Sequence, residues 1–457
     1  MNRRIWEHLL RGPRLKGRDA FGAISLALIM GVALFEPHFF SGPMLPNGPH
    51  VWLGDEPHYL VMVNSLLNDG DLELSNNYAA ANAGALDAGR RFAGRPLDHH
   101  TKWYVGERFI AWYEYFETNS AGWRRDRDGH PAPKPRHGCP AEWAPRREYS
   151  WHPPGLACVL SALLWPLRGS DLVEPMALVC SGASLFAAAC CFWRIVKPYA
   201  AGANAAWIVM AAAFLATPAW HYGRTLFTEP YLLACATGAY AAAFRRRSFL
   251  LAGCLIAVGV SMKPPLALLA LPLAAGALVR GRIVSAMGAI LPSCAAVAAL
   301  AALNYHMHGS WTRSPIQWIS GDFVEGATGL FFSWAHGLVP IAPLVVVALA
   351  CWPTFLRLHP YEGWQVAGAF LLYFCLMSAW VDWEGGLCYG PRMMVPVIPF
   401  LCVPLATAPR CVWWRFAPVR FVALELCLLS LAINGYAAIA NASVWGRNPL
   451  DFIIGWS

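Results

Sequence analysis

The feature that most constrains the fold of this chain is a series of long apolar segments separated by short polar loops. Most of these segments hold about 15–22 residues, close to the length that crosses about 30 Å of hydrocarbon as a helix. Hydrophobic residues make up 57% of the 457 residues and charged residues 14%, whereas an ordinary soluble domain has about 45–50% and about 25%. The pattern predicts an all-α polytopic membrane protein and excludes a soluble enzyme, a disordered chain, a coiled coil and a small disulfide-bonded scaffold.

The apolar segments predict about eleven transmembrane helices. The first is expected at 21–40, after a basic N-terminus that we place in the cytoplasm. The later ones are expected at 173–193, 201–219, 229–244, 248–262, 264–279, 284–304, 337–357, 364–381, 393–408 and 419–440. The chain then divides into a basic N-terminus with the first span (1–40), a large first extracytoplasmic loop with the catalytic motif and juxtamembrane helices (41–172), transmembrane helices (173–304), an extracytoplasmic lid loop (305–336) and C-terminal transmembrane helices (337–457).

The loops between the predicted spans alternate between two kinds. One kind is basic, as at Arg245-Arg246-Arg247, and we place it in the cytoplasm; the other carries motifs, and we place it outside. The assignment depends on 152–167, which is apolar but short for a span. We interpret that stretch as a helix at the outer membrane interface. Because the basic residues are scattered over loops and form no stripe, we expect no nucleic-acid partner.

Two adjacent carboxylates, Asp55 and Glu56, lie at the start of the large outer loop. Pro57 suits the first position of a helix, apolar residues continue at helical spacing, and Gly70 would end it. Unpaired backbone N–H groups keep carboxylates ionised at a helix start. An ionised carboxylate can act as a general base or bind a metal. The alternative is that Asp55 only caps the helix.

Motifs from Gly54 to Arg392 resemble, in order, those of bacterial GT-C-fold glycosyltransferases of the protein O-mannosyltransferase and aminoarabinose transferase type. The matching segments are GDEPHYL at 54–60, PAWHYGRTLFTEP at 218–230, MKPP at 262–265, GLFFSWAHGL at 329–338 and GGLCYGPR at 385–392. The chain departs from the family at His152-Pro153-Pro154, where relatives carry Lys-Pro-Pro, and at His336, where they commonly carry Arg.

The resemblance implies a GT-C-like membrane enzyme. It would be a hexosyl- or pentosyltransferase that moves a sugar, with inversion, from a polyprenyl-phosphate donor to an envelope acceptor. The acceptor is left open between a glycan, a lipid and a protein, and the sugar is unspecified. The protein would lie in a bacterial inner (cytoplasmic) membrane with its active site facing the periplasm. Its partners would be the donor, the acceptor and the bilayer; no cofactor is expected, and a need for a divalent metal is left open.

The resemblance and the placement of charge give the candidate site residues. The acceptor hydroxyl needs a base, for which Asp55 is the first choice and Glu56 the second. Donor-phosphate binding is expected from Arg224, Lys263, Arg392, His58 and Tyr389. Substrate contact is expected from His152, Arg313, Glu229 and Glu384. No metal ligand is named, because helical metal-site spacing is lacking at His99, His100, His130 and His137.

Other interpretations of the same residues stay open. Arg224 lies at a predicted span end and could reach lipid head groups, and Arg392 could form a structural ion-pair cluster with Asp382 and Glu384. The whole chain could instead be a lipid or solute transporter or flippase without transferase activity, or an envelope scaffold. A transporter would favour charges within broken helices of paired halves, whereas here the charges gather in outer loops.

Overall fold

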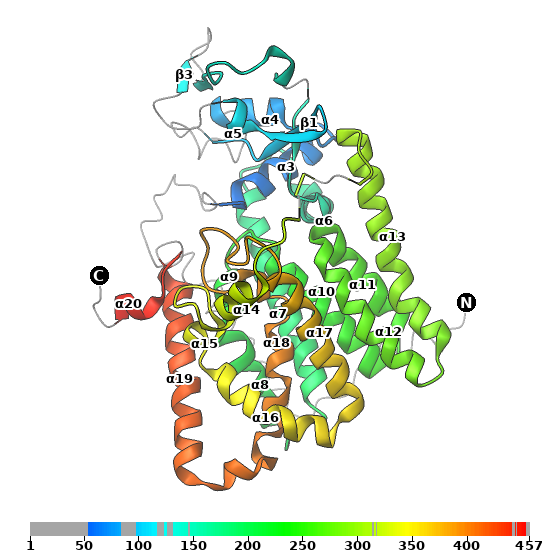
Figure 1. The fold of residues 1–457 in the computed structure, drawn as a ribbon, viewed down its shortest axis with the longest axis vertical. Helices are drawn as coiled ribbons and strands as arrows, with labels where there is room; N and C mark the ends of the chain where they lie inside the picture. Colours follow the sequence, from blue (N-terminus) through cyan, green and yellow to red (C-terminus); the bar gives the residue numbers. More distant parts are fainter. Residues whose placement is uncertain are drawn as a thin grey trace.

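The computed structural model of this protein describes most of the chain from residue 54 onward (Figure 1). The described residues are 54–83, 97–116, 123–125, 131–144, 147–312, 315–316, 318–440, 444 and 446–453. The predicted first span at 21–40 and the predicted substrate residue Arg313 lie outside the described residues.

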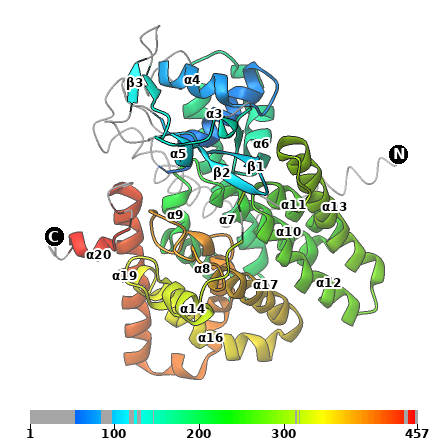
Figure 2. The same cartoon turned by 45° about the horizontal axis from the view of Figure 1, so that its top comes forward.

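A bundle of helices forms the larger body, and a smaller region of helices and strands covers one end of it (Figures 1 and 2). The helices of the bundle are α7 (Val173–Val196), α8 (Ala203–Leu215), α9 (Ala219–Tyr222), α10 (Glu229–Ala241), α11 (Phe249–Met262), α12 (Ala270–Val279), α13 (Ile283–His308), α14 (Phe323–Phe332), α15 (Leu338–Ile341), α16 (Leu344–Leu358), α17 (Pro360–Ser378), α18 (Ile398–Cys402) and α19 (Ala417–Ala440). Shorter helical turns include η5 (Pro264–Leu269), η6 (Arg392–Met394) and η7 (Val403–Arg410), and α20 (Pro449–Ile453) follows the bundle.

Three of the described helices, α7, α13 and α19, are long and apolar enough to cross a membrane. They agree with the predicted helical multi-pass membrane protein. The remaining spans predicted after residue 200 fall on helices that are shorter than α7, α13 and α19, or on helices that are interrupted. The segment predicted at 393–408 is broken into η6, α18 and η7, because Pro396, Pro399 and Pro404 each lack the N–H that a continuous helix needs. The count of about eleven spans stays a prediction.

The smaller region shows that the expectation of an all-α chain is wrong for the large outer loop. Beside α3 (Glu56–Asn68), α4 (Ser75–Ala83), α5 (Trp112–Tyr115) and α6 (Gly155–Leu164), it contains β1 (Thr101–Val105), β2 (Arg108–Ala111), β3 (Trp123–Arg125), β4 (Pro131–Pro133) and β5 (Tyr149–Ser150). The sheets are antiparallel, with strand order β2-β1-β5 and the separate pair β3-β4. Aromatic and β-branched residues favour strands, and the turn Gly106-Glu107 has positive φ at both residues, as a tight hairpin requires.

Close contact between α6 and α11 fixes the smaller region to the bundle. Gly155 begins α6, and a Cβ at this position would lie 2.3 Å from Oγ of Ser261 in α11. The two backbones can approach only because the side chain is missing, as is common between membrane helices. Gly155 follows His152 by three residues and Ser261 precedes Lys263 by two. The contact therefore brings two predicted site segments together.

Candidate active site

Asp55 occupies the N-cap position of α3, yet its side chain does not cap the helix. Its Oδ2 instead accepts a hydrogen bond from Nη2 of Arg392 at 2.6 Å. The preceding Gly54 has a φ of +60°, a left-handed conformation that glycine adopts without strain, so the chain can turn sharply into the helix. The helix-cap interpretation therefore does not account for this carboxylate.

Four charged side chains from four separate segments form a continuous chain of ion pairs. Arg392, which opens η6, also donates from Nε to Oε1 of Glu229 at 3.0 Å. Lys263, which precedes η5, donates from Nζ to the same oxygen at 3.1 Å. With Asp55 at the far end, two anions alternate with two cations, and the network is balanced internally. Glu229 is fully buried at the start of α10, and such a carboxylate requires these partners.

The adjacent carboxyl groups at the start of α3 differ in protonation. Burial alone would raise the pKa of Asp55, but the charge and hydrogen bond of Arg392, together with His152 and His100, outweigh burial and hold that pKa well below its usual range. Burial raises the pKa of Glu56 to about 8, although its Oε1 accepts a hydrogen bond from the backbone N–H of Leu226 at 2.8 Å. At neutral pH Asp55 is therefore ionised and Glu56 is mostly protonated. Only Asp55 is in the form that a general base requires.

Arg224 is a buried cation whose Nε and Nη1 have no hydrogen-bond partner. The residue is 7% exposed, and none of the ion pairs found in the described part of the chain includes it. Burial lowers the pKa of Arg224 to about 10, so the guanidinium is still charged at neutral pH. It precedes Leu226 and Phe227, of which the first binds Glu56 and the second lies under the Arg392 guanidinium at 4.0 Å. An unpaired buried cation is costly, and a bound anion would remove that cost.

The other oxygen of Asp55 faces two histidines. Oδ1 lies 3.8 Å from Nδ1 of His100 and 3.6 Å from Nε2 of His152, and these two nitrogens are 3.2 Å apart. The ring of His58 stacks on that of His100, with 3.4 Å between centroids. Asp55, His100 and His152 lie close enough together to hold a metal ion. They come from the start of α3, the residue before β1 and the turn before α6.

Of the remaining predicted site residues, His58 lies beside the Asp55 group, whereas Tyr389 and Glu384 do not contact it. The Nδ1 atom of His58 lies 2.9 Å from the hydroxyl of Tyr78, beside the histidines described above. Tyr389 is buried in the bundle, where its hydroxyl donates to Oδ1 of Asn434 and its carbonyl oxygen accepts from Tyr222. These hydrogen bonds indicate a structural role for its hydroxyl. Glu384 is exposed, and the ion pairs of Arg392 are formed elsewhere, with Asp55 and Glu229.

Sequence reasoning missed His100 as a member of this group. Its partners are far away in the sequence, so no local spacing reveals them. It also missed Phe227, whose ring lies against Arg392. The only available signal was the abundance of histidines in the outer loop, which includes the pair His99-His100. That signal names a candidate residue and not its partners.

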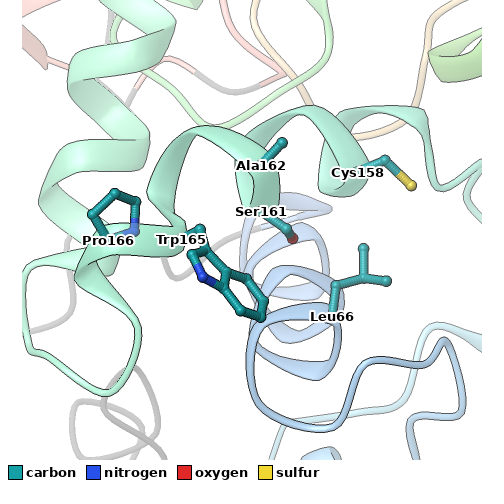
Figure 3. Close-up of a pocket in the computed structure, with 6 residues that line it drawn as sticks. All are labelled: Leu66, Cys158, Ser161, Ala162, Trp165 and Pro166. Atoms are coloured by element: carbon teal, nitrogen blue, oxygen red, sulfur yellow. The ribbon is translucent and has the colours of Figure 1, made fainter.

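An open apolar pocket of about 530 Å³ lies beside α3 and α6 (Figure 3). It is lined by Leu66, Cys158, Ser161, Ala162, Trp165 and Pro166. Leu66 lies roughly 16 Å along α3 from Asp55, at about 1.5 Å per residue. The lining is largely apolar, so this pocket suits hydrocarbon better than a sugar.

Comparisons with known proteins give a likeness in fold only. No family model matches the chain, and neither does any curated protein. The chain is similar to the crystal structure of ArnT from Cupriavidus metallidurans bound to undecaprenyl phosphate, with a TM-score of 0.49 and 13% identity over 92% of this chain and 76% of that one. For the apo state of the same protein the TM-score is 0.46, with 13% identity over 93% of this chain and 74% of that one. A likeness of this size carries no weight for activity, which has to be argued from the site itself.

Proposed function

We propose that this protein is a membrane glycosyltransferase that moves a sugar from a polyprenyl-phosphate donor to an acceptor hydroxyl, with Asp55 as the general base. The observation that carries the proposal is the ionised Asp55 carboxylate, bound to Arg392 at the meeting point of four segments. A base and fixed cations thus lie within the span of one sugar phosphate. Transfer to a hydroxyl with a phosphate leaving group needs both.

Arg224 is the residue best suited to bind the donor phosphate. Arg392 and Lys263 already share Glu229 and Asp55, whereas two nitrogens of the Arg224 guanidinium are unpaired. A guanidinium can hold a phosphate through two parallel N–H···O bonds. Within the proposal, Arg224 contacts the phosphate directly, while Arg392 and Lys263 lie in a network whose two carboxylates balance their charge.

The reaction follows from these positions. The acceptor oxygen attacks the anomeric carbon from the face opposite the phosphate, and the bond between that carbon and the phosphate oxygen breaks. The acceptor proton passes to Asp55, and the electron pair leaves with the phosphate, whose charge the cations stabilise. A single displacement inverts the anomeric centre and forms no covalent sugar–enzyme intermediate. Because burial keeps Glu56 mostly protonated, it is not the base in this mechanism.

The proposal extends to the setting of the site. The active site faces the periplasm of a bacterial inner membrane, because the basic loops that include Arg245-Arg246-Arg247 lie on the cytoplasmic side. The apolar pocket beside α3 and α6 accommodates part of the polyprenyl chain. The loops at 41–172 and 305–336 select the sugar, a hexose or a pentose, and the acceptor.

The test is transfer from a labelled polyprenyl-phosphate sugar by the purified full-length protein in nanodiscs, with an envelope extract as the source of acceptor. We expect free polyprenyl phosphate and labelled acceptor to appear together. A flippase would move the intact donor between leaflets of a vesicle without cleaving it. Donor that is moved but never cleaved would contradict the transferase and support the transporter.

A further inference from the structure

We infer that Asp55, His100 and His152 form a binding site for one divalent metal ion of the zinc class. Three ligand atoms converge there: Oδ1 of the carboxylate, Nδ1 of the first histidine and Nε2 of the second. Two histidines and one carboxylate are a common set of ligands for zinc and for non-haem iron. The inference does not require the transferase activity, because metal binding is measured without substrate.

The spacing of the ligand atoms suits a tetrahedral ion. Metal–ligand bonds of about 2.0–2.1 Å place the ligands of such an ion roughly 3.3–3.4 Å apart. The three separations in the site are 3.2, 3.6 and 3.8 Å. Small shifts of the two histidine rings would close the longer ones. Three protein ligands leave the fourth position open to water or a substrate oxygen, as in catalytic zinc sites.

The hydrogen-bonding pattern around His100 also favours a cation. A neutral imidazole has a single N–H group, yet both ring nitrogens face carboxylates: Nδ1 faces Asp55 and Nε2 faces Asp98, each at 3.8 Å. If the proton is on Nε2, the lone pair on Nδ1 faces Oδ1 of Asp55 with no proton between them. A metal ion at that point would bind both, and would bind His152 as well once Trp151 releases its nitrogen. Asp98 would then orient the ring from behind, as outer carboxylates do for metal-bound histidines.

Both proposed histidine ligands are held in place by neighbouring groups. The ring of His100 stacks between His58 and Trp151, with 3.4 and 4.3 Å between centroids. One donor competes for the site, since Nε1 of Trp151 donates to Nε2 of His152 at 2.9 Å. That indole must turn away when the ion binds.

The site connects the metal to the rest of the active site through one carboxylate. Oδ1 of Asp55 would bind the ion while Oδ2 keeps its hydrogen bond to Arg392. A carboxylate shared in this way is a weaker base than a free one, so the ion would regulate the group proposed to take the acceptor proton. Zinc would then lower transfer when it fills the site.

The experiment measures metal binding by the purified full-length protein after removal of metal with a chelator. Zn²⁺ alone is added, and bound zinc is determined by elemental analysis and titration; Co²⁺ is then used to report tetrahedral geometry by its visible spectrum. We expect one ion per chain. His100→Ala and His152→Ala should each lose more affinity than the about 10–100-fold that outer-shell changes cost, and Asp98→Asn should fall within that range.

Two further variants make the result specific. His137→Ala removes an exposed histidine of the same loop and should bind zinc like the wild type. Trp151→Phe removes the competing indole N–H but keeps a ring beside His100, and it should bind zinc at least as tightly. Folding of each variant is checked by its melting temperature in chelator. Failure of the wild type to bind zinc, or equal binding by folded His100→Ala and His152→Ala, would overturn the inference even if transfer from the lipid donor is observed.

Discussion

The two oxygens of Asp55 lie in contrasting environments. On the bundle side, Oδ2 belongs to a charged network in which Arg392 connects it to Glu229 and Lys263. On the side of the outer loop, Oδ1 faces His100 and His152, two rings whose pKa values are lowered by burial. One side fixes the carboxylate by charge, and the other presents neutral lone pairs.

The contrast explains how one carboxylate can be held rigidly and kept ionised. The ion pair with Arg392 keeps the group ionised and sets its position, while the neutral histidines leave the second oxygen free to bind a proton or a metal ion. A base held in this way does not have to be desolvated or reoriented before it reacts. Substitutions on the bundle side should therefore alter the ionisation of Asp55 and the binding of the donor. Substitutions of the histidines on the loop side should alter which ligands Oδ1 of Asp55 can bind.

The largest effect is expected from Asp55→Asn, which removes the base at the junction of the two sides. Transfer should fall by about 10²–10⁴-fold, the usual contribution of general-base catalysis. Donor binding should change little, since the Asn oxygen can still accept from Arg392. Turnover in nanodiscs and binding of the labelled donor are the two measurements. Wild-type turnover in this variant would assign the base to another group.

The next effect concerns pH and Glu56 on the bundle side. The folded protein favours the protonated form of this group, because its pKa is raised from 4.5 to about 8. Its contribution to stability is therefore complete below about pH 4.5 and is lost as the pH rises toward 8, with a loss on the order of a few kcal/mol. Glu56→Gln cannot titrate, so its melting temperature should fall less than that of the wild type between pH 5 and pH 8.5. If the melting temperatures of the two proteins fall equally between pH 5 and pH 8.5, Glu56 is not protonated in the folded protein.

A smaller effect is expected from Arg224→Ala, which removes the cation without a counter-ion. Affinity for the polyprenyl-phosphate donor should fall by about 10–100-fold, which corresponds to the loss of a charged hydrogen bond worth about 1.5–3 kcal/mol. The stability of the free protein should hold or rise, because an unpaired buried charge is removed. Arg357→Ala is the matched control, since Arg357 is exposed near the end of α16 and belongs to none of the proposed binding surfaces. Equal donor affinity of Arg224→Ala and the wild type would place the phosphate elsewhere.

The smallest effect should come from Tyr389→Phe. Its hydroxyl bonds to Asn434 within the bundle, so its loss should cost about 1 kcal/mol of stability. Affinity for the donor should stay within twofold of the wild type, roughly the error of such a comparison. Thermal melting and donor titration separate the two outcomes. A large loss of donor affinity without loss of stability would instead support the sequence-based prediction that Tyr389 binds the donor phosphate.

The sequence predicted the charged side of the site better than the histidine side, for a physical reason. Asp55, Lys263 and Arg392 each stand within a short motif that resembles one of the family's, so the series of motifs marked all three. His100 became significant only through its distance to Asp55 and His152, which depends on how the outer loop folds back. The strands of that loop were missed for a similar reason: β1 pairs with the distant β5, and the surrounding segments read as polar loop.

The helical body was predictable because each apolar segment indicates a helix by its own length and composition. What length could not give was where proline interrupts a segment, as in the break between η6 and α18. The ion pair between Glu229 and Arg392 was also beyond prediction, since the two residues come from different helical segments. Sequence reasoning had offered Asp382 and Glu384 as partners of Arg392 because they are neighbours in the chain.

The most direct test of the account is the position of a donor phosphate in an experimental structure of the protein with a polyprenyl phosphate bound. We predict that the phosphate lies within hydrogen-bond distance, about 3 Å, of the Arg224 guanidinium. Asp55 should remain bound to Arg392 through its Oδ2 atom. A lipid phosphate bound on the cytoplasmic side of the bundle, or more than about 20 Å from Asp55 and thus much beyond the reach of one sugar phosphate, would contradict the proposed active site.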